Sequence, residues 1–145
     1  MVHVELKARI PGHKAAEAYA ILSDFSAYAA CVDAVRSITV EKQDGLFLSN
    51  WEVNFHGGIM RWKEEDTFLP EHHAIQFKQI EGDVDYFMGE WRLVDEAGGC
   101  VITFECDFDL GLSGLSALLE PIADSALQEN VRGIVSGLLG DVTFF

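Results

Sequence analysis

Between residues 35 and 110 the chain consists of short segments in which apolar and polar residues alternate. Short turns rich in glycine, such as Asp44-Gly45 and Gly98-Gly99, separate these segments. The segments cover residues 36–41, 47–55, 59–69, 74–80, 86–94 and 100–110. Alternation is typical of strands with one buried face, and short turns join antiparallel neighbours because a parallel crossover needs a dozen or more residues. The sequence therefore predicts an antiparallel meander of six strands.

Further elements are expected on both sides of this meander. Residues 2–10 alternate like another strand and end at Pro11-Gly12, which brings the sheet to seven strands. Two short helices should follow that first strand. The last third of the chain has its apolar residues on one helical stripe, which predicts an amphipathic helix over residues 113–139 that Pro121 either kinks or begins. The order of elements predicts an α+β fold in a single domain over residues 1–145.

The composition limits the choice of partners. The chain carries 24 acidic and 10 basic residues, a formal charge of -14, and no basic run interrupts this excess. Such a charge repels phosphate backbones and anionic headgroups, so we expect neither nucleic acid nor a membrane surface as a partner. Because 49% of the residues are hydrophobic, the chain has enough apolar material for a core. The composition does not exclude a small neutral molecule as the ligand.

Cysteine usage and the amino terminus bear on the compartment. The three cysteines are an odd number without CxxC spacing, which favours free thiols in a reducing environment. The first twelve residues alternate and lack the continuous apolar region of a signal peptide. No stretch approaches the roughly 20 apolar residues of a membrane span. We therefore expect a cytoplasmic protein without membrane insertion.

A strand, two short helices, six strands and a long helix are the order of the helix-grip fold. The chain resembles the START/Bet v 1-like (SRPBCC) superfamily, and within it the polyketide cyclase and aromatase branch. The similarity covers nearly the whole chain and rests on Ser23-Asp24-Phe25-Ser26-Ala27-Tyr28, Gly58-Ile59-Met60-Arg61-Trp62, Gly89-Glu90-Trp91-Arg92-Leu93 and Phe104-Glu105-Cys106-Asp107-Phe108. The resemblance implies a seven-stranded antiparallel sheet wrapped around the carboxy-terminal helix. The superfamily also contains carriers without catalytic activity, so the fold alone leaves enzyme and carrier open.

In such a fold, the strand residues that face the long helix define the chemistry. Alternation assigns an aromatic wall to this face, and we expect a cavity there of a few hundred Å³, roughly the usual size of small-molecule sites. The expected lining residues are Trp51, Trp62, Phe77, Trp91, Phe104 and Phe108, with Gln79 and Cys106 among them and Tyr28 added by the resemblance. Asn130, on the inner stripe of the helix, either contacts ligand or joins helix to sheet. The alternative is that the rings fill a solid core.

The same alternation carries two acids inward. On residues 59–69 the large apolar groups Met60 and Trp62 must face the core, and Glu64 and Asp66 share their face. An ionised carboxylate is costly to desolvate, so these acids titrate upward, pair with a cation or lie at a wet pocket mouth. Alternatively, a β-bulge or strand end places them in solvent.

The resemblance also implies catalytic residues, and these match poorly. The family's buried arginine falls on Asp66, and its tyrosine falls on Ala34, so neither role is transferred, and Arg61 is expected to point outward. Cys106 without a His partner is more typical of a small buried residue than of a nucleophile. The histidines at positions 56, 72 and 73 complete no ligand set and are interpreted as surface residues, so no metal or cofactor is expected.

Two hypotheses of different classes remain. The first is a cofactor-independent cyclase or aromatase that catalyses aldol-type cyclisation and dehydration of a poly-β-ketone, with Glu64 and Asp66 transferring protons. The second is a non-catalytic carrier of a quinone, lipid or natural product. The missing arginine favours the carrier, and the inward acids favour the enzyme. In both cases the expected partner is a hydrophobic or aromatic small molecule, free or presented by an acyl carrier protein.

Overall fold

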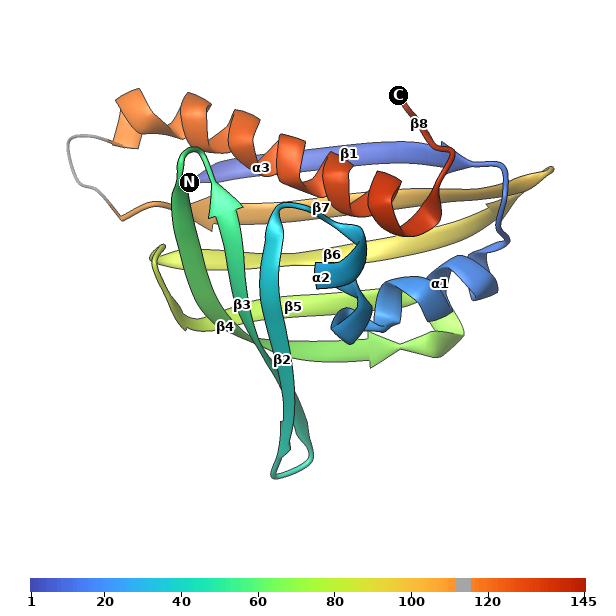
Figure 1. The fold of residues 1–145 in the computed structure, drawn as a ribbon, viewed down its shortest axis with the longest axis horizontal. Helices are drawn as coiled ribbons and strands as arrows, with labels where there is room; N and C mark the ends of the chain where they lie inside the picture. The colour runs from blue at the N-terminus through green and yellow to red at the C-terminus, as the bar shows by residue number, and fades with distance from the viewer. Residues whose placement is uncertain (112–115) are drawn as a thin grey trace.

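The computed structural model describes residues 1–111 and 116–145. Within them, an antiparallel sheet curves beneath the long helix α3 (Ser116–Leu139), with α1 (Ala15–Ser23) and α2 (Tyr28–Cys31) beside it (Figure 1). The strands are β1 (Val2–Ile10), β2 (Val35–Gln43), β3 (Leu46–Phe55), β4 (Gly58–Leu69), β5 (Ala74–Gly82), β6 (Tyr86–Glu96), β7 (Gly99–Asp109) and β8 (Thr143–Phe144). Their order across the sheet is β2-β3-β4-β5-β6-β7-β1-β8. The expected helix-grip α+β fold is confirmed.

The prediction of seven strands is wrong, because the described residues form eight. β8 pairs with β1 through Ala8 and Phe144, and the Phe145 amide donates to the Lys7 carbonyl at 3.0 Å. The Arg9 guanidinium lies 4.6 Å from the centre of the Phe145 ring. A strand of two residues is too short to show alternation, so the sequence pattern carries no sign of it.

The helices are only partly as predicted. A 3₁₀ turn, η1 (Phe25–Ala27), joins α1 to α2, which is only four residues long. The fully buried Tyr28 donates its hydroxyl to the Leu22 carbonyl at 2.6 Å, and this bond ties α2 to the end of α1. Pro121 lies inside α3. The first residues of the predicted long helix, 113–115, lie outside the described residues. No described helix is long and apolar enough to cross a bilayer.

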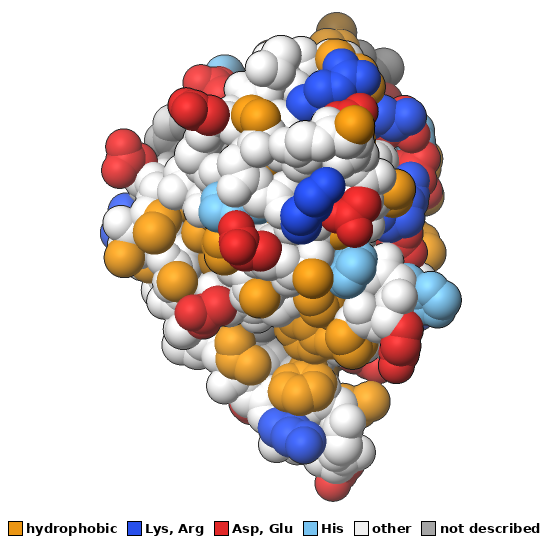
Figure 2. Space-filling model, turned by 90° about the vertical axis from the view of Figure 1, so that its right-hand side faces the viewer, with side chains coloured by type: hydrophobic (Ala, Val, Ile, Leu, Met, Phe, Trp, Pro, Cys, Tyr) orange, Lys and Arg blue, Asp and Glu red, His pale blue; other side chains and the backbone are white. Residues whose placement is uncertain are grey.

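The hairpin turns follow from residues that accept positive φ. Asp44 and Gly45 have φ of 52° and 80°, and His56 and Gly57 have 46° and 79°. Two consecutive residues with positive φ suit the right-handed twist of paired strands. The β2–β3 hairpin projects beyond the body of the sheet (Figure 1). Figure 2 shows hydrophobic side chains gathered on the lower half of one face. Leu46 and Phe47, which follow the turn of this hairpin, are exposed.

Candidate functional site

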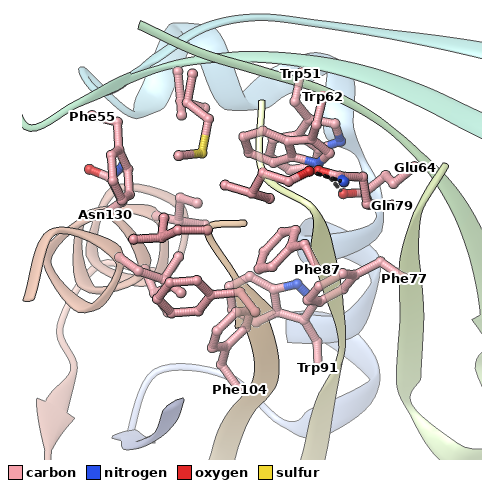
Figure 3. A pocket seen from close by; sticks show the side chains of 18 residues that line it. Trp51, Phe55, Trp62, Glu64, Phe77, Gln79, Phe87, Trp91, Phe104 and Asn130 are labelled. Atoms are coloured by element: carbon pink, nitrogen blue, oxygen red, sulfur yellow. Dashed lines mark hydrogen bonds between the residues drawn. The ribbon is translucent and has the colours of Figure 1, made fainter. Parts of the chain in front are cut away.

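A cavity of about 70 Å³ lies between the concave face of the sheet and α3 (Figure 3). Trp62, Glu64 and Gln79 converge at one end, and Phe55 and Asn130 lie at the other. Of the residues predicted from the sequence, those that line the cavity are Trp51, Trp62, Glu64, Phe77, Gln79, Trp91, Phe104, Phe108 and Asn130. Alternation along β3 to β7 therefore brings most of the predicted side chains to one place.

The cavity is smaller than the few hundred Å³ expected, and that prediction is wrong. The rings of the wall pack against one another and fill much of the interior. The Trp51 and Trp62 rings stack with centroids 5.3 Å apart, and Phe104 packs 4.7 Å from Trp91 and 5.8 Å from Phe77. Since a cavity needs on the order of 10–15 Å³ to hold one water, the remaining space holds a few waters. The interior is thus part core and part cavity.

Three predicted residues lie outside the cavity lining. Tyr28 is enclosed behind Trp51, with ring centroids 5.7 Å apart. Cys106 is buried in β7, and desolvation raises the pKa of its thiol to about 12, which keeps it neutral. Asp66 is 4% exposed and lies behind Glu64. Their influence on a ligand must therefore pass through the residues in front of them.

The lining also includes residues that the sequence analysis did not name as cavity residues. Phe87, Met60 and Leu127 lie on inward faces of β6, β4 and α3 and were recognisable from the alternation and the helical stripe. Val84 lies in the turn between β5 and β6, where no periodic pattern identifies inward residues. Ser49, on β3, was passed over because the inward set was chosen for large apolar side chains, yet it is fully buried beside the acids.

The inward acids occupy a dry position. Glu64 is 3% exposed, and its Oε1 accepts a hydrogen bond from Trp62 Nε1 at 2.6 Å. Asp66 Oδ2 accepts a hydrogen bond from Ser49 Oγ at 2.5 Å. A bulge does occur here, but it lies in β5: Lys63 pairs with Glu81 and Glu64 with Gln79, so Ile80 is the extra residue. The alternation of β4 stays intact, and both acids remain inside.

Burial changes the protonation of this acid pair. Desolvation raises the pKa of Glu64 well above its usual range, and the hydrogen bond and charge repulsion from Asp66 raise it further. Desolvation also raises the pKa of Asp66, although hydrogen bonds from Glu64 and Ser49 oppose the rise. The Asp66 Oδ1 atom is buried and has no hydrogen-bond partner among the described residues. A proton held between the two carboxyls would supply that partner and would leave the pair with a single negative charge.

The two amide side chains of the lining, those of Gln79 and Asn130, donate hydrogen bonds to backbone carbonyls. Gln79 Nε2 donates to the Val84 carbonyl at 2.7 Å, and Asn130 Nδ2 donates to the Asn54 carbonyl at 3.0 Å. Asn130 therefore joins helix to sheet while also lining the cavity, which combines the two alternatives left open. Arg61 points outward and pairs with Glu52 at 3.3 Å. The described lining contains no lysine or arginine.

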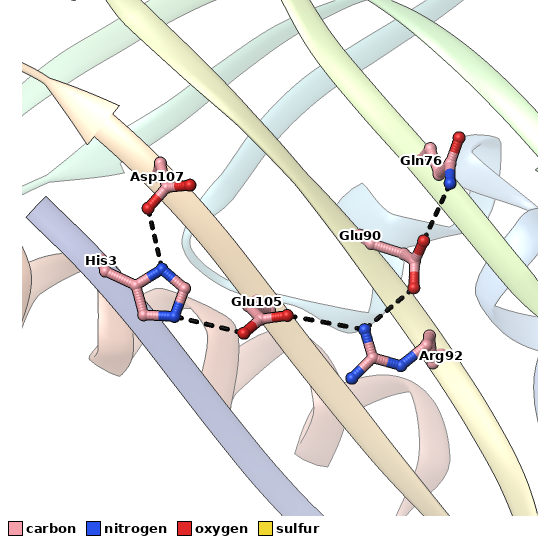
Figure 4. Close-up of polar contacts among 6 residues, drawn as sticks. All are labelled: His3, Gln76, Glu90, Arg92, Glu105 and Asp107. Carbon is pink, nitrogen blue, oxygen red and sulfur yellow. Dashed lines mark hydrogen bonds and ion pairs between the residues drawn. The ribbon is translucent and has the colours of Figure 1, made fainter.

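A second polar cluster lies on the opposite, outer face of the sheet (Figure 4). His3 Nδ1 lies 2.8 Å from Asp107 and its Nε2 lies 3.2 Å from Glu105. The hydrogen bond to Asp107 raises the pKa of His3. Arg92 lies 2.9 Å from Glu90 and 3.6 Å from Glu105. These exposed contacts link β1, β7 and β6 on the face of the sheet that points away from α3 (Figure 4).

Comparison with known proteins agrees with this architecture. The model of a family described as polyketide cyclase / dehydrase and lipid transport matches residues 11–135. The chain belongs to this family. The match confirms the polyketide cyclase family that the sequence analysis expected. No curated protein matches the chain significantly.

Solved structures support the fold over nearly the whole length. The protein TTHA0849 from Thermus thermophilus is 25% identical to this chain. The alignment covers 94% of each chain, with a TM-score of 0.86. The Zhui aromatase/cyclase from Streptomyces sp. R1128 is 18% identical over 96% of this chain and 92% of its own, with a TM-score of 0.79. Major latex-like protein 151 from Panax ginseng is 13% identical over 94% and 93%, with a TM-score of 0.72. The neighbours thus include an aromatase/cyclase as well as a plant protein of the same fold.

Proposed function

We propose that this protein is a cofactor-independent cyclase that performs aldol-type ring closure and dehydration on a poly-β-ketone, free or as a carrier-bound thioester. The observation that carries the proposal is the buried acid pair, one member of which, Glu64, lines an aromatic cavity. Ring closure of a polyketone requires a base to remove a proton from carbon and an acid to protonate oxygen. A carboxyl pair that holds one proton can present either form to the ligand.

Glu64 is the acid in contact with the cavity, so it makes the proton transfers to substrate. When the shared proton moves to Asp66, the Glu64 carboxylate removes a proton from the carbon between two carbonyls and an enolate forms. The enolate carbon attacks the acceptor carbonyl, and Glu64 returns the proton to the new alkoxide oxygen. In the dehydration, Glu64 again takes a proton from carbon and gives it to the hydroxyl, which leaves as water. Asp66 keeps the original proton of the pair throughout these steps.

The aromatic wall of the cavity suits a flat aromatic product. Trp62, Phe87 and Phe77 present ring faces and edges to the cavity, and flat rings pack well against them. A polyketone is larger than a cavity of about 70 Å³, so side chains must move to admit it. Met60, Phe87 and Leu127 are among the half-buried residues of the lining, so they have room to move outward. The flexible thioether of Met60 adapts most readily to a new shape.

The test is isosteric replacement of the acids. Glu64→Gln or Asp66→Asn keeps the shape and removes the titration, so cyclised product should fall by roughly 10²-fold or more. Product from a poly-β-ketone thioester is followed by chromatography and ultraviolet absorbance. Glu65→Gln is the matched control, because Glu65 lies between the two acids on β4 but faces the other side. Unchanged cyclisation in both single variants and the double variant would exclude the acids from the reaction.

A second function, ligand carriage without turnover, is favoured by one observation. The described lining offers no basic side chain to stabilise an enolate. For a carrier, a neutral fluorescent probe such as N-phenyl-1-naphthylamine should bind, Glu64→Gln should change its affinity only slightly, and no polyketone should be converted. Conversion that depends on Glu64 decides for the enzyme.

A further inference from the structure

Ser49 is a fully buried polar residue beside the acid pair. It lies on β3 directly opposite Glu64 of β4 in the sheet register. Its Oγ donates to Asp66 Oδ2 at 2.5 Å and accepts a hydrogen bond from Trp51 Nε1 at 2.8 Å. Ser49 therefore connects a tryptophan of the cavity wall to the acid that lies behind that wall.

The direction of these hydrogen bonds is determined by chemistry. An indole nitrogen can only donate, so Trp51 occupies an acceptor site on the Ser49 oxygen. The hydroxyl proton of Ser49 must then point to an acceptor, and Asp66 Oδ2 lies within hydrogen-bonding distance. Hydrogen bonds to an ionised carboxylate are about twice as strong as neutral ones. The contact thus favours the ionised form of Asp66.

Glu64 receives a different donor. Trp62 Nε1 donates to its Oε1 at 2.6 Å, while Asp66 Oδ1 is left without a partner among the described residues. A proton on Glu64 directed at Asp66 Oδ1 satisfies that atom and keeps the negative charge beside the Ser49 hydroxyl. A proton on Asp66 instead would leave the Ser49 hydroxyl facing a neutral acid and would place the charge on the carboxyl that lines the apolar cavity.

We propose that Ser49 is a positioning residue that holds the negative charge of the acid pair on Asp66 and the remaining proton on Glu64, facing the cavity. The effect on turnover rests on the proposed function, but the distribution of charge does not. Ser49 itself does not line the cavity, so it acts through Asp66.

The other charged or titratable groups near the pair do not substitute for Ser49. Tyr28 of α2 faces both acids, and burial raises the pKa of its phenol well above the usual range, so it stays neutral. Glu65 on β4 repels a charge on Asp66, and Asp24, before η1, acts on Tyr28. None of the ion pairs among the described residues includes Glu64 or Asp66. Ser49 is thus a neutral donor in a site otherwise surrounded by acids.

The experiment measures the titration of the pair directly. Protein labelled with carbon-13 at the aspartate and glutamate carboxyls is titrated by NMR in the wild type and in Ser49→Ala. Loss of the hydroxyl should raise the lower midpoint of the pair by about one to two pH units, since hydrogen bonds to a charged group are stronger than those between neutral groups. The Asp66 resonance should follow that lower step in the wild type, and in Ser49→Ala the step should be shared between both acids.

Two further variants keep the test decisive. Ser49→Cys fills the site with a weak donor and should give an intermediate midpoint, which also covers the case in which Ser49→Ala does not fold. Thr103→Val removes another buried sheet hydroxyl without touching the acids and should leave both midpoints unchanged. Equal midpoints in the wild type, Ser49→Ala and Ser49→Cys would overturn the proposal, as would a lower step that belongs to Glu64 in the wild type.

The activity assay separates this proposal from the proposed function. If the protein cyclises polyketones, the acidic limb of the kcat profile should move upward in Ser49→Ala by the same amount as the NMR midpoint. If no cyclisation occurs, the proposed function fails, while the NMR midpoints still decide the role of Ser49. A fall in kcat without any displacement of the acidic limb would indicate a structural effect alone and would overturn the positioning role.

Discussion

Replacement of Glu64 by glutamine should stabilise the protein at neutral and alkaline pH. Burial raises the pKa of Glu64 above its ordinary value of 4.5, so the folded protein binds this proton more tightly than the unfolded chain. A group of this kind contributes most to stability below its unfolded pKa, and that contribution is lost as the pH rises through the folded pKa. The wild type should therefore lose stability between about pH 4.5 and the raised pKa of Glu64.

The magnitude follows from what glutamine keeps and removes. Its amide oxygen retains the hydrogen bond from Trp62 Nε1, worth about 1 kcal/mol, and its amide nitrogen can donate to the unpartnered Asp66 Oδ1. What disappears is the cost of ionising or protonating a buried acid. That cost is about 1.4 kcal/mol for each pH unit between the folded and unfolded pKa values.

The assay is urea denaturation of the wild type, Glu64→Gln and Glu65→Gln at about pH 5 and about pH 8. Glu64→Gln should gain stability over the wild type at the higher pH by more than 1 kcal/mol, roughly one pH unit of pKa elevation, and should nearly match it at the lower pH. The outward Glu65→Gln variant removes only the smallest of the effects on the pKa of Asp66, so its stability should follow that of the wild type closely at both pH values. An equal loss of stability for Glu64→Gln at both pH values would refute the reasoning, because it would show that the carboxyl is not held protonated by the fold.

Two other predictions address positions away from the cavity. The raised pKa of His3 means that its charge stabilises the fold below the ordinary pKa of 6.5 and that this contribution is lost as the pH rises through the folded value, so His3→Gln should lower Tm in acid and leave it unchanged in alkali. On α3, a Cβ at Gly133 meets nothing within 4 Å, whereas one at Gly137 would collide with the Cys31 carbonyl. Gly133→Ala should therefore stabilise the protein by about 1 kcal/mol and Gly137→Ala should destabilise it by about 1–3 kcal/mol in the same urea titration, and equal effects would contradict the described packing of α3 against α2.

The inward position of the acids was predictable because a period of two leaves no freedom once Met60 and Trp62 are assigned to the core. Which acid reaches the cavity was not predictable, since both share a face and only side-chain packing puts Asp66 behind Glu64. The cavity volume depends on ring orientations, such as the stacking of Trp51 on Trp62, which alternation does not encode. Ser49 has a small polar side chain in an aromatic row, and the same pattern would result from a residue that merely fills space.

The charge at position 66 separates this chain from the arginine-dependent chemistry that the resemblance implies. An arginine there would bring a permanent positive charge toward an enolate, whereas Asp66 brings a negative one that repels it. The negative charge of the acid pair is stabilised by neutral donors, Trp62 and Ser49, and by a proton between the acids. A site of this kind cannot hold an enolate by ion pairing. It can act only while one proton remains in the pair, so activity should fall both when the pair gains a second proton and when it loses its last one. The proposed chemistry is therefore proton shuttling through Glu64 and not electrostatic stabilisation by a cation.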